Sequence, residues 1–136
     1  MTTRVLLVDD HRLMCEVLEF VVQLEPDLNV VGTAPDAESA LAAVEWALPD
    51  IVVMDVGLGG MDGIAATREL TFRHPDVRVV MLSASCTRTL VTDSFAAGAW
   101  GYLVKTGPPE ELITAIREVS QGRRSLAPSA RALLET

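Results

Sequence analysis

Five polar residues of this chain stand at the ends of short apolar runs. Asp9 and Asp10 follow the first run, Asp55 follows the third, Ser83 ends the fourth and Lys105 follows the fifth. Carboxylate oxygens are ligands for hard divalent cations, and a carboxylate can also act as a nucleophile. A hydroxyl or an ammonium group can hydrogen-bond to an anion. These side chains therefore predict cation-assisted chemistry on an anionic group, provided that the fold brings them together.

Three carboxylates at one place need positive charge beside them. Two such charges about 4 Å apart repel each other by roughly 4 kcal/mol at an effective dielectric constant near 20. Lys105 supplies one positive charge, and a divalent cation would supply the rest. Mg²⁺ usually takes one or two carboxylates and a phosphate oxygen as ligands. The acids therefore predict a Mg²⁺ site at which a phosphoryl group is transferred to a protein oxygen.

The apolar runs are typical of buried strands, and the stretches between them are typical of helices. The runs are continuously apolar, as expected of strands that are covered on both faces. They lie at residues 5–8, 28–33, 51–54, 77–82 and 102–104. Apolar residues at helical spacing lie between and after them, in a stripe from Leu13 to Leu24 and in residues 37–46, 64–72, 90–97 and 112–119.

The order of strand and helix, repeated five times, predicts an open α/β sheet of parallel strands with helices on both faces. In such sheets the functional site lies beyond the carboxyl ends of the strands. This is where the five polar residues are expected. We predict a domain over residues 1–122 and a linker or connector over residues 123–136, with a short helix that begins at Pro128 and runs to Leu134.

Composition and charge restrict the class of protein. The chain has 136 residues, a formal net charge of -8 and 49% hydrophobic residues, which suits one packed domain. An acidic domain repels nucleic acid and anionic lipid, so this segment is not expected to bind either by itself. The tail is basic around Arg123, Arg124 and Arg131, which indicates a linker to another part of the protein.

The sequence predicts a cytoplasmic location. The first apolar run is too short for a secretory signal, and no segment approaches the length of a membrane span. Cys15 and Cys86 lie far apart in the sequence and are predicted to be buried thiols in a reducing cytosol.

Each polar residue also has an ordinary structural interpretation. Asp10 could cap the helix that begins at His11, and Asp55 could be a turn residue before the glycines. Lys105 and Ser83 could be an ordinary surface lysine and strand-end serine. Their joint placement at successive strand ends favours the functional interpretation.

Four segments together resemble the receiver domain of two-component response regulators. They read VLLVDDH, DIVVMDVGLGGMDG, VVMLSAS and GAWGYLVK, and the resemblance covers about residues 4–122. It implies a five-stranded, flavodoxin-like doubly wound sheet with the strand order 2-1-3-4-5. It also implies a phosphoacceptor signalling domain that assists its own phosphorylation and dephosphorylation and is not otherwise an enzyme.

The resemblance assigns metal and phosphoacceptor roles by position. Asp55 would be the phosphorylated residue and a Mg²⁺ ligand. Asp10 would bind the ion directly, Asp9 mostly through water, and Gly57 through its carbonyl oxygen.

The resemblance also assigns the residues that respond to the phosphoryl group. Lys105 would pair with its oxygens, and Ser83 would hydrogen-bond to them. Tyr102 would be an aromatic switch that turns inward when Ser83 moves. The alternative for Tyr102 is an interfacial aromatic residue with a hydrated hydroxyl group.

Two departures from the family pattern indicate a subfamily. Leu58 and Gly59 replace a common Met-Pro pair, so the GLGG loop is expected to be mobile, and Thr106 replaces a common proline. With the tail RRSLAPSARALLE, this resembles the NarL/FixJ group, which carries a LuxR-type helix-turn-helix domain. The implied partners are a sensor histidine kinase, a second copy upon phosphorylation, and DNA through a domain beyond Thr136, with no membrane partner.

Three alternatives remain open. An aspartyl phosphatase would need a second acid near Asp55, for which Asp62 is the nearby candidate, although it is expected to cap a helix at Gly63. A flavin-binding module would need a neutral loop where Asp9 and Asp10 stand. A degenerate receiver would fold without being phosphorylated.

Overall fold

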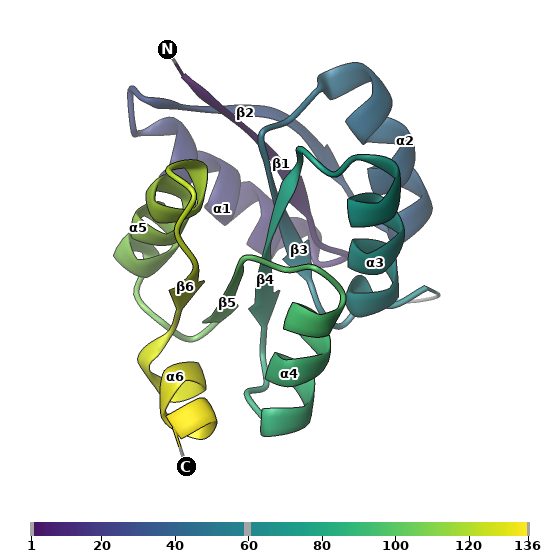
Figure 1. The fold of residues 1–136 in the computed structure, drawn as a ribbon. Helices are drawn as coiled ribbons and strands as arrows, with labels where there is room; N and C mark the ends of the chain where they lie inside the picture. Colours follow the sequence, from purple (N-terminus) through teal and green to yellow (C-terminus); the bar gives the residue numbers. More distant parts are fainter. Residues whose placement is uncertain (1, 59–60, 136) are drawn as a thin grey trace.

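Each of the five apolar runs forms a parallel β-strand in the computed structural model, which describes residues 2–58 and 61–135. The strands are β1 (Thr3–Val8), β2 (Leu28–Ala34), β3 (Ile51–Asp55), β4 (Arg78–Ser83) and β5 (Gly101–Val104). Within the described residues they lie in the order β2-β1-β3-β4-β5, and a further strand follows β5 (Figure 1). The predicted α/β sheet and its doubly wound order are confirmed.

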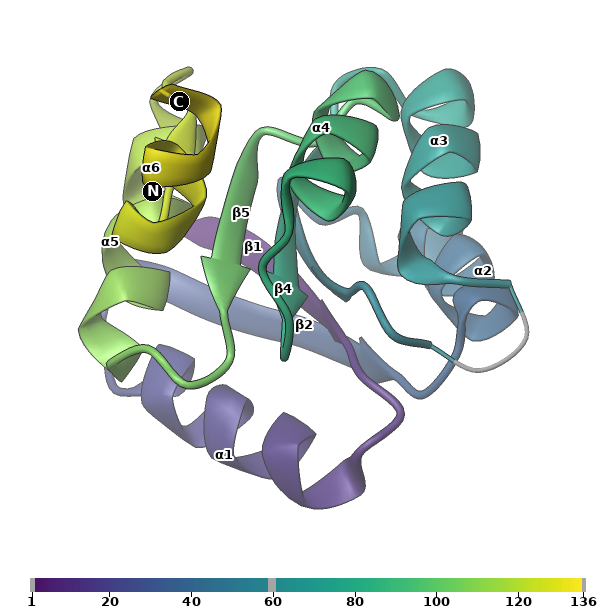
Figure 2. The same cartoon turned by 90° about the horizontal axis from the view of Figure 1, so that it is seen from below.

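Helices cover both faces of the sheet, as Figures 1 and 2 show. α1 (Arg12–Gln23) and α5 (Pro109–Ser120) lie on one face, and α2 (Ala37–Ala47), α3 (Gly63–Arg73) and α4 (Arg88–Ala96) lie on the other. Alternate strand residues point to opposite faces, so Leu6 and Val52 pack under α2–α4, whereas Leu7 and Val53 pack under α1 and α5. No helix in the described ranges has the length and apolar character needed to span a membrane.

The apolar stripe predicted along the first helix lies mostly on the solvent side of α1. Leu13, Phe20 and Leu24 are exposed, whereas Cys15 and Val22 are the buried residues of this helix. The helix carries apolar residues on two faces, and helical spacing alone does not say which face meets the sheet.

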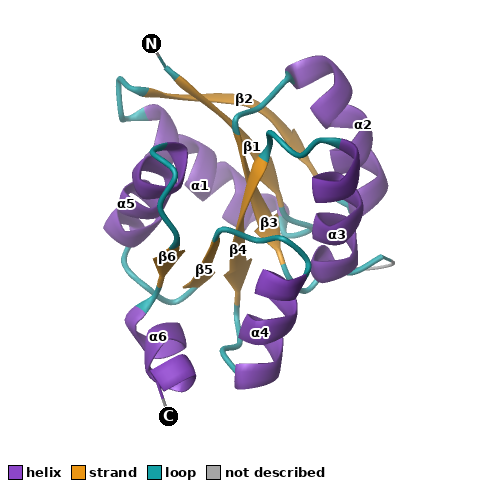
Figure 3. Cartoon of the chain, viewed as in Figure 1, coloured by secondary structure: helices purple, strands orange, loops and turns teal. Residues whose placement is uncertain are grey.

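A sixth strand, which the sequence did not predict, lies at the edge of the sheet (Figure 3). After α5 the chain turns at Gly122, whose φ of 84° suits glycine, and then forms β6 (Ser125–Leu126) beside β5. The amide of Ser125 donates to the carbonyl of Trp100 at 3.0 Å, and the amide of Ala127 donates to that of Tyr102 at 2.9 Å. Two residues are too short a run to be recognised as a strand.

The C-terminal segment packs on the domain. The helix predicted to begin at Pro128 is present as α6 (Pro128–Glu135), and it lies next to α4 (Figure 1). Ala130 of α6 is fully buried in the same core as Tyr102. The guanidinium of Arg124 lies 4.9 Å from the ring centre of Trp100, which holds the start of the segment.

Both cysteines are free thiols. Cys15 is buried as predicted, and burial raises the pKa of its thiol. Cys86 is only half-buried, which corrects the prediction for this residue. It lies in the loop between β4 and α4, where one side of the chain faces solvent.

Candidate functional site

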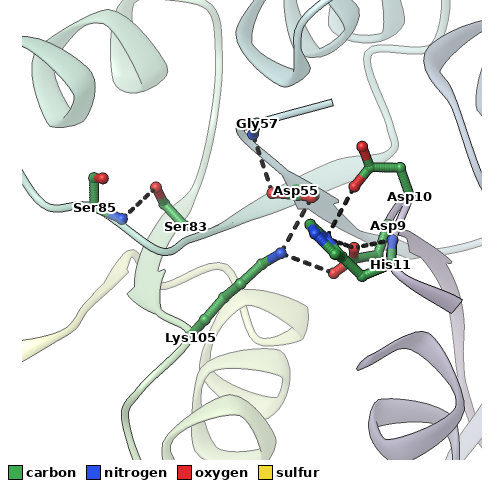
Figure 4. A network of polar contacts seen from close by, with 8 residues as sticks. All are labelled: Asp9, Asp10, His11, Asp55, Gly57, Ser83, Ser85 and Lys105. Atoms are coloured by element: carbon green, nitrogen blue, oxygen red, sulfur yellow. Dashed lines mark hydrogen bonds and ion pairs between the residues drawn. The ribbon is translucent and has the colours of Figure 1, made fainter. Parts of the chain in front are cut away.

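The parallel strands bring the predicted residues to one edge of the sheet (Figure 4). β1 pairs with β3 up to Val8 and Met54, so Asp9 and Asp55 follow side by side. Ser83 ends β4 and pairs with Val104 of β5, and Lys105 is the residue that follows Val104. The amide of Lys105 donates to the carbonyl of Ser83 at 2.8 Å.

Lys105 connects two of the aspartates. Its Nζ lies 3.0 Å from Oδ2 of Asp9 and 3.1 Å from Oδ2 of Asp55. The exposed fractions of the three side chains are 10%, 2% and 4%. Burial opposes the charge of Lys105, but the two carboxylates outweigh burial and raise its pKa. The lysine is therefore held as a cation in a nearly dry site.

Asp55 is a buried carboxylate with charged neighbours on more than one side. Burial raises its pKa; the hydrogen bond from the Gly57 amide and the contact with Lys105 oppose this, and the charge of Asp9 adds to it. The Gly57 amide donates to Oδ1 at 3.0 Å. The pKa of Asp55 remains raised overall, because burial together with the charge of Asp9 outweighs the Gly57 hydrogen bond and the contact with Lys105.

Two buried carboxylate oxygens of the site share one partner. These atoms are Oδ2 of Asp9 and Oδ2 of Asp55, and among the described residues neither has a partner other than the ammonium of Lys105. Each lies close to Nζ of Lys105, which neutralises charge without saturating the lone pairs of the oxygen. Hard oxygen donors with spare lone pairs and surplus negative charge fit a divalent cation such as Mg²⁺. Asp10 can complete the set, because one of its carboxylate oxygens lies in the same group of candidate ligand atoms.

His11 belongs to the site, although the sequence did not predict it. Nδ1 of His11 lies 3.0 Å from Oδ1 of Asp10 and 3.3 Å from Oδ1 of Asp9. One ligand atom from each of Asp9, Asp10, His11 and Asp55 lies within 4.8 Å of the others. The position of His11 directly after Asp9 and Asp10 could have indicated this role, but a residue at the start of a helix is ordinarily interpreted as part of the helix.

The structure decides two of the capping alternatives. α1 begins at Arg12, and its N-cap residue is His11 without a side-chain capping bond, so Asp10 does not cap this helix. Asp62 is the N-cap of α3, where its Oδ1 accepts from the amide of Ala65 at 2.7 Å. Asp62 therefore has a structural role, as expected.

Gly63 is a second residue that the sequence prediction missed. A Cβ at this position would lie 2.0 Å from the carbonyl oxygen of Asp55, which is far inside contact distance. Only glycine allows α3 to begin so close to the end of β3. The neighbouring Gly59 of the GLGG loop lies outside the described residues, and the predicted carbonyl ligand of Gly57 remains a prediction.

Ser83 and Tyr102 meet at Ser85. Oγ of Ser83 accepts from the amide of Ser85 at 3.1 Å, and the hydroxyl of Tyr102 donates to the carbonyl of Ser85 at 2.7 Å. Tyr102 is fully buried, which excludes the hydrated interfacial position considered for it. Figure 4 shows the hydroxyl of Ser83 turned toward Ser85, apart from the acids around Asp55.

Comparison with known proteins agrees with this geometry. The sequence pattern of the response regulator receiver domain matches residues 5–117. The chain is 36% identical to the transcriptional regulatory protein DegU of Brevibacillus brevis, over 92% of this chain and 53% of that protein. It is 38% identical to the DNA-binding transcriptional activator DevR/DosR of Mycobacterium tuberculosis, over 96% of this chain and 60% of that protein.

A solved structure has the same fold over almost its whole length. It is a two-component response regulator of the LuxR family from Aurantimonas sp. SI85-9A1, with a TM-score of 0.95 and 34% identity, covering 99% of this chain and 97% of that chain. By contrast, the chain spans only 53% and 60% of the two transcriptional regulators named above.

Proposed function

Because this chain belongs to the receiver-domain family of two-component response regulators, in its NarL/LuxR group, we propose that Asp55 accepts a phosphoryl group from a histidine kinase in a Mg²⁺-dependent reaction. One observation carries this proposal above the others. A buried carboxylate with a raised pKa lies 3.1 Å from a buried lysine, and this ammonium is the single partner of its Oδ2 among the described residues. This is a nucleophile held where a cation and an anion would both be favourable.

The residues of the site have three roles, which are metal binding, charge neutralisation and attack on phosphorus. Asp9, Asp10, Asp55 and the carbonyl of Gly57 would hold Mg²⁺, which when bound offsets the charge of the acids and of the incoming phosphoryl group. Lys105 contributes its fixed positive charge at the oxygens of that group. An oxygen of Asp55 forms the new bond to phosphorus while the bond from phosphorus to the donor histidine nitrogen breaks.

Phosphorylation would change the hydrogen bonds around Ser85. The new group has about two negative charges and three acceptor oxygens, so it competes for the hydroxyl of Ser83. When Ser83 turns to donate to it, the amide of Ser85 loses its acceptor. Tyr102 follows, because its hydroxyl donates to the carbonyl of Ser85. Tyr102 is the proposed switch residue.

The change would reach the C-terminal segment through β5. The carbonyl of Tyr102 accepts the amide of Ala127, at the start of the segment that forms α6. The transcriptional regulators similar to this chain are longer than it, so we place DNA binding in a further domain after this segment. Self-association upon phosphorylation and a cytoplasmic location belong to the same proposal.

The test is phosphorylation by a small donor. The chain is incubated with acetyl phosphate and Mg²⁺, and its intact mass is measured. The wild type should gain one phosphoryl mass, and Asp55→Asn should gain none. Asp62→Asn is the matched control, because asparagine also caps helices and Asp62 lies only a few residues away. Equal labelling of wild type and Asp55→Asn would refute the proposal, and no labelling of wild type would favour a degenerate receiver.

Two observations favour this proposal over the enzyme and cofactor alternatives. A phosphatase would need a general acid, and Asp62 is engaged as a helix cap. A flavin phosphate would meet the buried carboxylate of Asp9 and the charge of Asp10. Turnover of a generic phosphomonoester that Asp55→Asn abolishes would revive the first alternative.

A further inference from the structure

The imidazole of His11 is held beside the acids of the site by its own backbone. The amide of His11 donates to Oδ1 of Asp9 at 2.8 Å, and its carbonyl accepts the amide of Cys15 at 3.0 Å as α1 begins. Both peptide groups of the residue are thus anchored, and only side-chain rotation remains. The side chain is 71% exposed, yet its Nδ1 contacts the carboxylates of Asp9 and Asp10 (Figure 4).

The arrangement is slightly wider than a mixed nitrogen and oxygen metal site. Ligand atoms about 2.0–2.2 Å from an ion lie roughly 3–4.4 Å apart. The four candidate atoms around Asp55 lie within 4.8 Å of one another, so a small rotation of the exposed side chains closes the difference. Binding through Nδ1 leaves Nε2 of the imidazole toward solvent, where water satisfies it.

The ordinary roles of a histidine at this place do not account for the geometry. His11 is the N-cap residue of α1, but its side chain makes no capping bond, and histidine is not among the favoured N-cap residues. A hydrogen bond from Nδ1 to the acids is the remaining alternative. Such a bond would orient Asp10 without touching the ion, so it is the alternative that the experiment must separate from direct binding.

We propose that His11 is a direct nitrogen ligand for a divalent transition metal in the Asp55 pocket, which makes this pocket select Mn²⁺, Co²⁺, Ni²⁺ or Zn²⁺ over Mg²⁺. The inference rests on the proposed function only in that it uses the same carboxylates. Imidazole is a good ligand for these ions, whose affinity for nitrogen donors rises from Mn²⁺ to Ni²⁺, whereas Mg²⁺ prefers oxygen. The metal that occupies the pocket would then depend on which ions are available.

Selectivity is measured first by calorimetric titration with Ni²⁺ and with Mg²⁺ at one fixed pH, on protein without a histidine tag. In His11→Asn the affinity for Ni²⁺ should fall by about tenfold or more, because a ligand is lost. The affinity for Mg²⁺ should change by less than about threefold, because its oxygen ligands remain. Asparagine keeps a polar group that can donate to Asp10, so with a purely orienting role the affinities for Ni²⁺ and Mg²⁺ would both change little and to the same extent.

Direct binding is measured by electron spin-echo envelope modulation of the one-to-one Mn²⁺ complex. Wild type should show coupling to a directly bound ¹⁴N, and His11→Asn should lose it. The chain has two histidines, so His74→Asn is the matched control and should keep the coupling. His74 contacts Glu45 on the other side of the fold.

The possible outcomes separate this inference from the proposed function. Mn²⁺ binding without ¹⁴N coupling, or coupling that disappears in His74→Asn, overturns the role of His11. Absence of Mn²⁺ binding overturns it as well. None of these results concerns phosphorylation of wild type with Mg²⁺, which decides the proposed function by itself.

Discussion

Two clusters in this chain each set one cation against two carboxylates. In the first, Lys105 lies 3.0 Å and 3.1 Å from Asp9 and Asp55 at the carboxyl edge of the sheet. In the second, Arg117 of α5 lies 2.6 Å from Glu25 and 2.8 Å from Asp27 in the turn after α1. The number of charges is the same, but the surroundings differ. The Lys105 cluster is nearly dry, whereas the three side chains of the Arg117 cluster are 33–47% exposed.

The carboxylates of the two clusters respond in opposite directions. The hydrogen bonds from Arg117 lower the pKa of Asp27, and the guanidinium donates to both oxygens of that carboxylate at 2.9 Å and 2.8 Å. Burial raises the pKa of Asp55, and its Oδ2 shares the single ammonium of Lys105 with Asp9. In the Arg117 cluster the carboxylates are thus hydrogen-bonded to the guanidinium, and the contact joins α5 to the turn after α1. The Lys105 cluster is incomplete, which leaves it ready for a cation and a phosphoryl group.

Removal of Lys105 should have the largest effect on stability. Lys105→Met leaves buried carboxylates without their cation, and the loss of one partner of a buried pair costs about 3–5 kcal/mol. We expect a decrease of this size in the free energy of unfolding near pH 7, measured by urea denaturation. Arg117→Met is the matched control and should cost less, because water solvates Asp27 and Glu25. Equal losses in the two variants would contradict the comparison.

Binding of Mg²⁺ at the Lys105 cluster should have the second-largest effect on the free energy of unfolding. A ligand that binds only the folded state at about 100 times its Kd raises the free energy of unfolding by about 2.7 kcal/mol. We expect this increase for wild type by denaturation with and without Mg²⁺, and its loss in Asp10→Asn. Asp27→Asn should respond like wild type. If Mg²⁺ still stabilised Asp10→Asn, the ion would have to bind at another place in the chain.

Neutralising Asp55 should raise stability. Its raised folded-state pKa means that the folded chain holds the proton longer, so charging Asp55 costs stability as pH rises above the ordinary pKa of 3.8 and through the folded-state value. Asp55→Asn removes this cost, and we expect a gain of about 1 kcal/mol near pH 7 without Mg²⁺. The gain should disappear below pH 3.8.

Asp27→Asn should change the free energy of unfolding in the direction opposite to Asp55→Asn. The lowered pKa of Asp27 gives stability that is present above 3.8 and is lost as pH falls through the folded-state pKa. Its substitution should therefore lower the free energy of unfolding near pH 7. Changes of the same sign in Asp55→Asn and Asp27→Asn would refute the contrast between the clusters.

The smallest expected effect is the influence of salt on the stability that is lost when Arg117 is replaced. The loss of stability in Arg117→Gln should shrink in about 1 M NaCl, where screening acts over about 3 Å, because this cluster is exposed. The loss in Lys105→Met should persist, since its carboxylates are buried. Denaturation of both variants at low and high salt measures the difference. A loss at Arg117 that salt does not change would mean that the guanidinium acts through packing.

The pattern of the sequence determined that parallel strands alternate with helices, and it identified the residues of the Lys105 cluster, whereas the strand order was implied by the resemblance to receiver domains. Continuous apolar runs identify buried strands, and parallel strands place Asp9, Asp55, Ser83 and Lys105 at one edge whatever the details of packing. The short spacing from Asp62 to the next helix was enough to predict its capping role. These results depend on local pattern and on chirality, which sequence carries directly.

Tertiary structure alone decided which of these charges are satisfied. The close approach of α3 to the end of β3 at Gly63 and the pairing of β6 with β5 both join parts of the chain through space. Nothing in the spacing of residues says that Asp55 loses water while Asp27 keeps it. Burial is a property of the packed chain, and burial is what sets the two clusters apart.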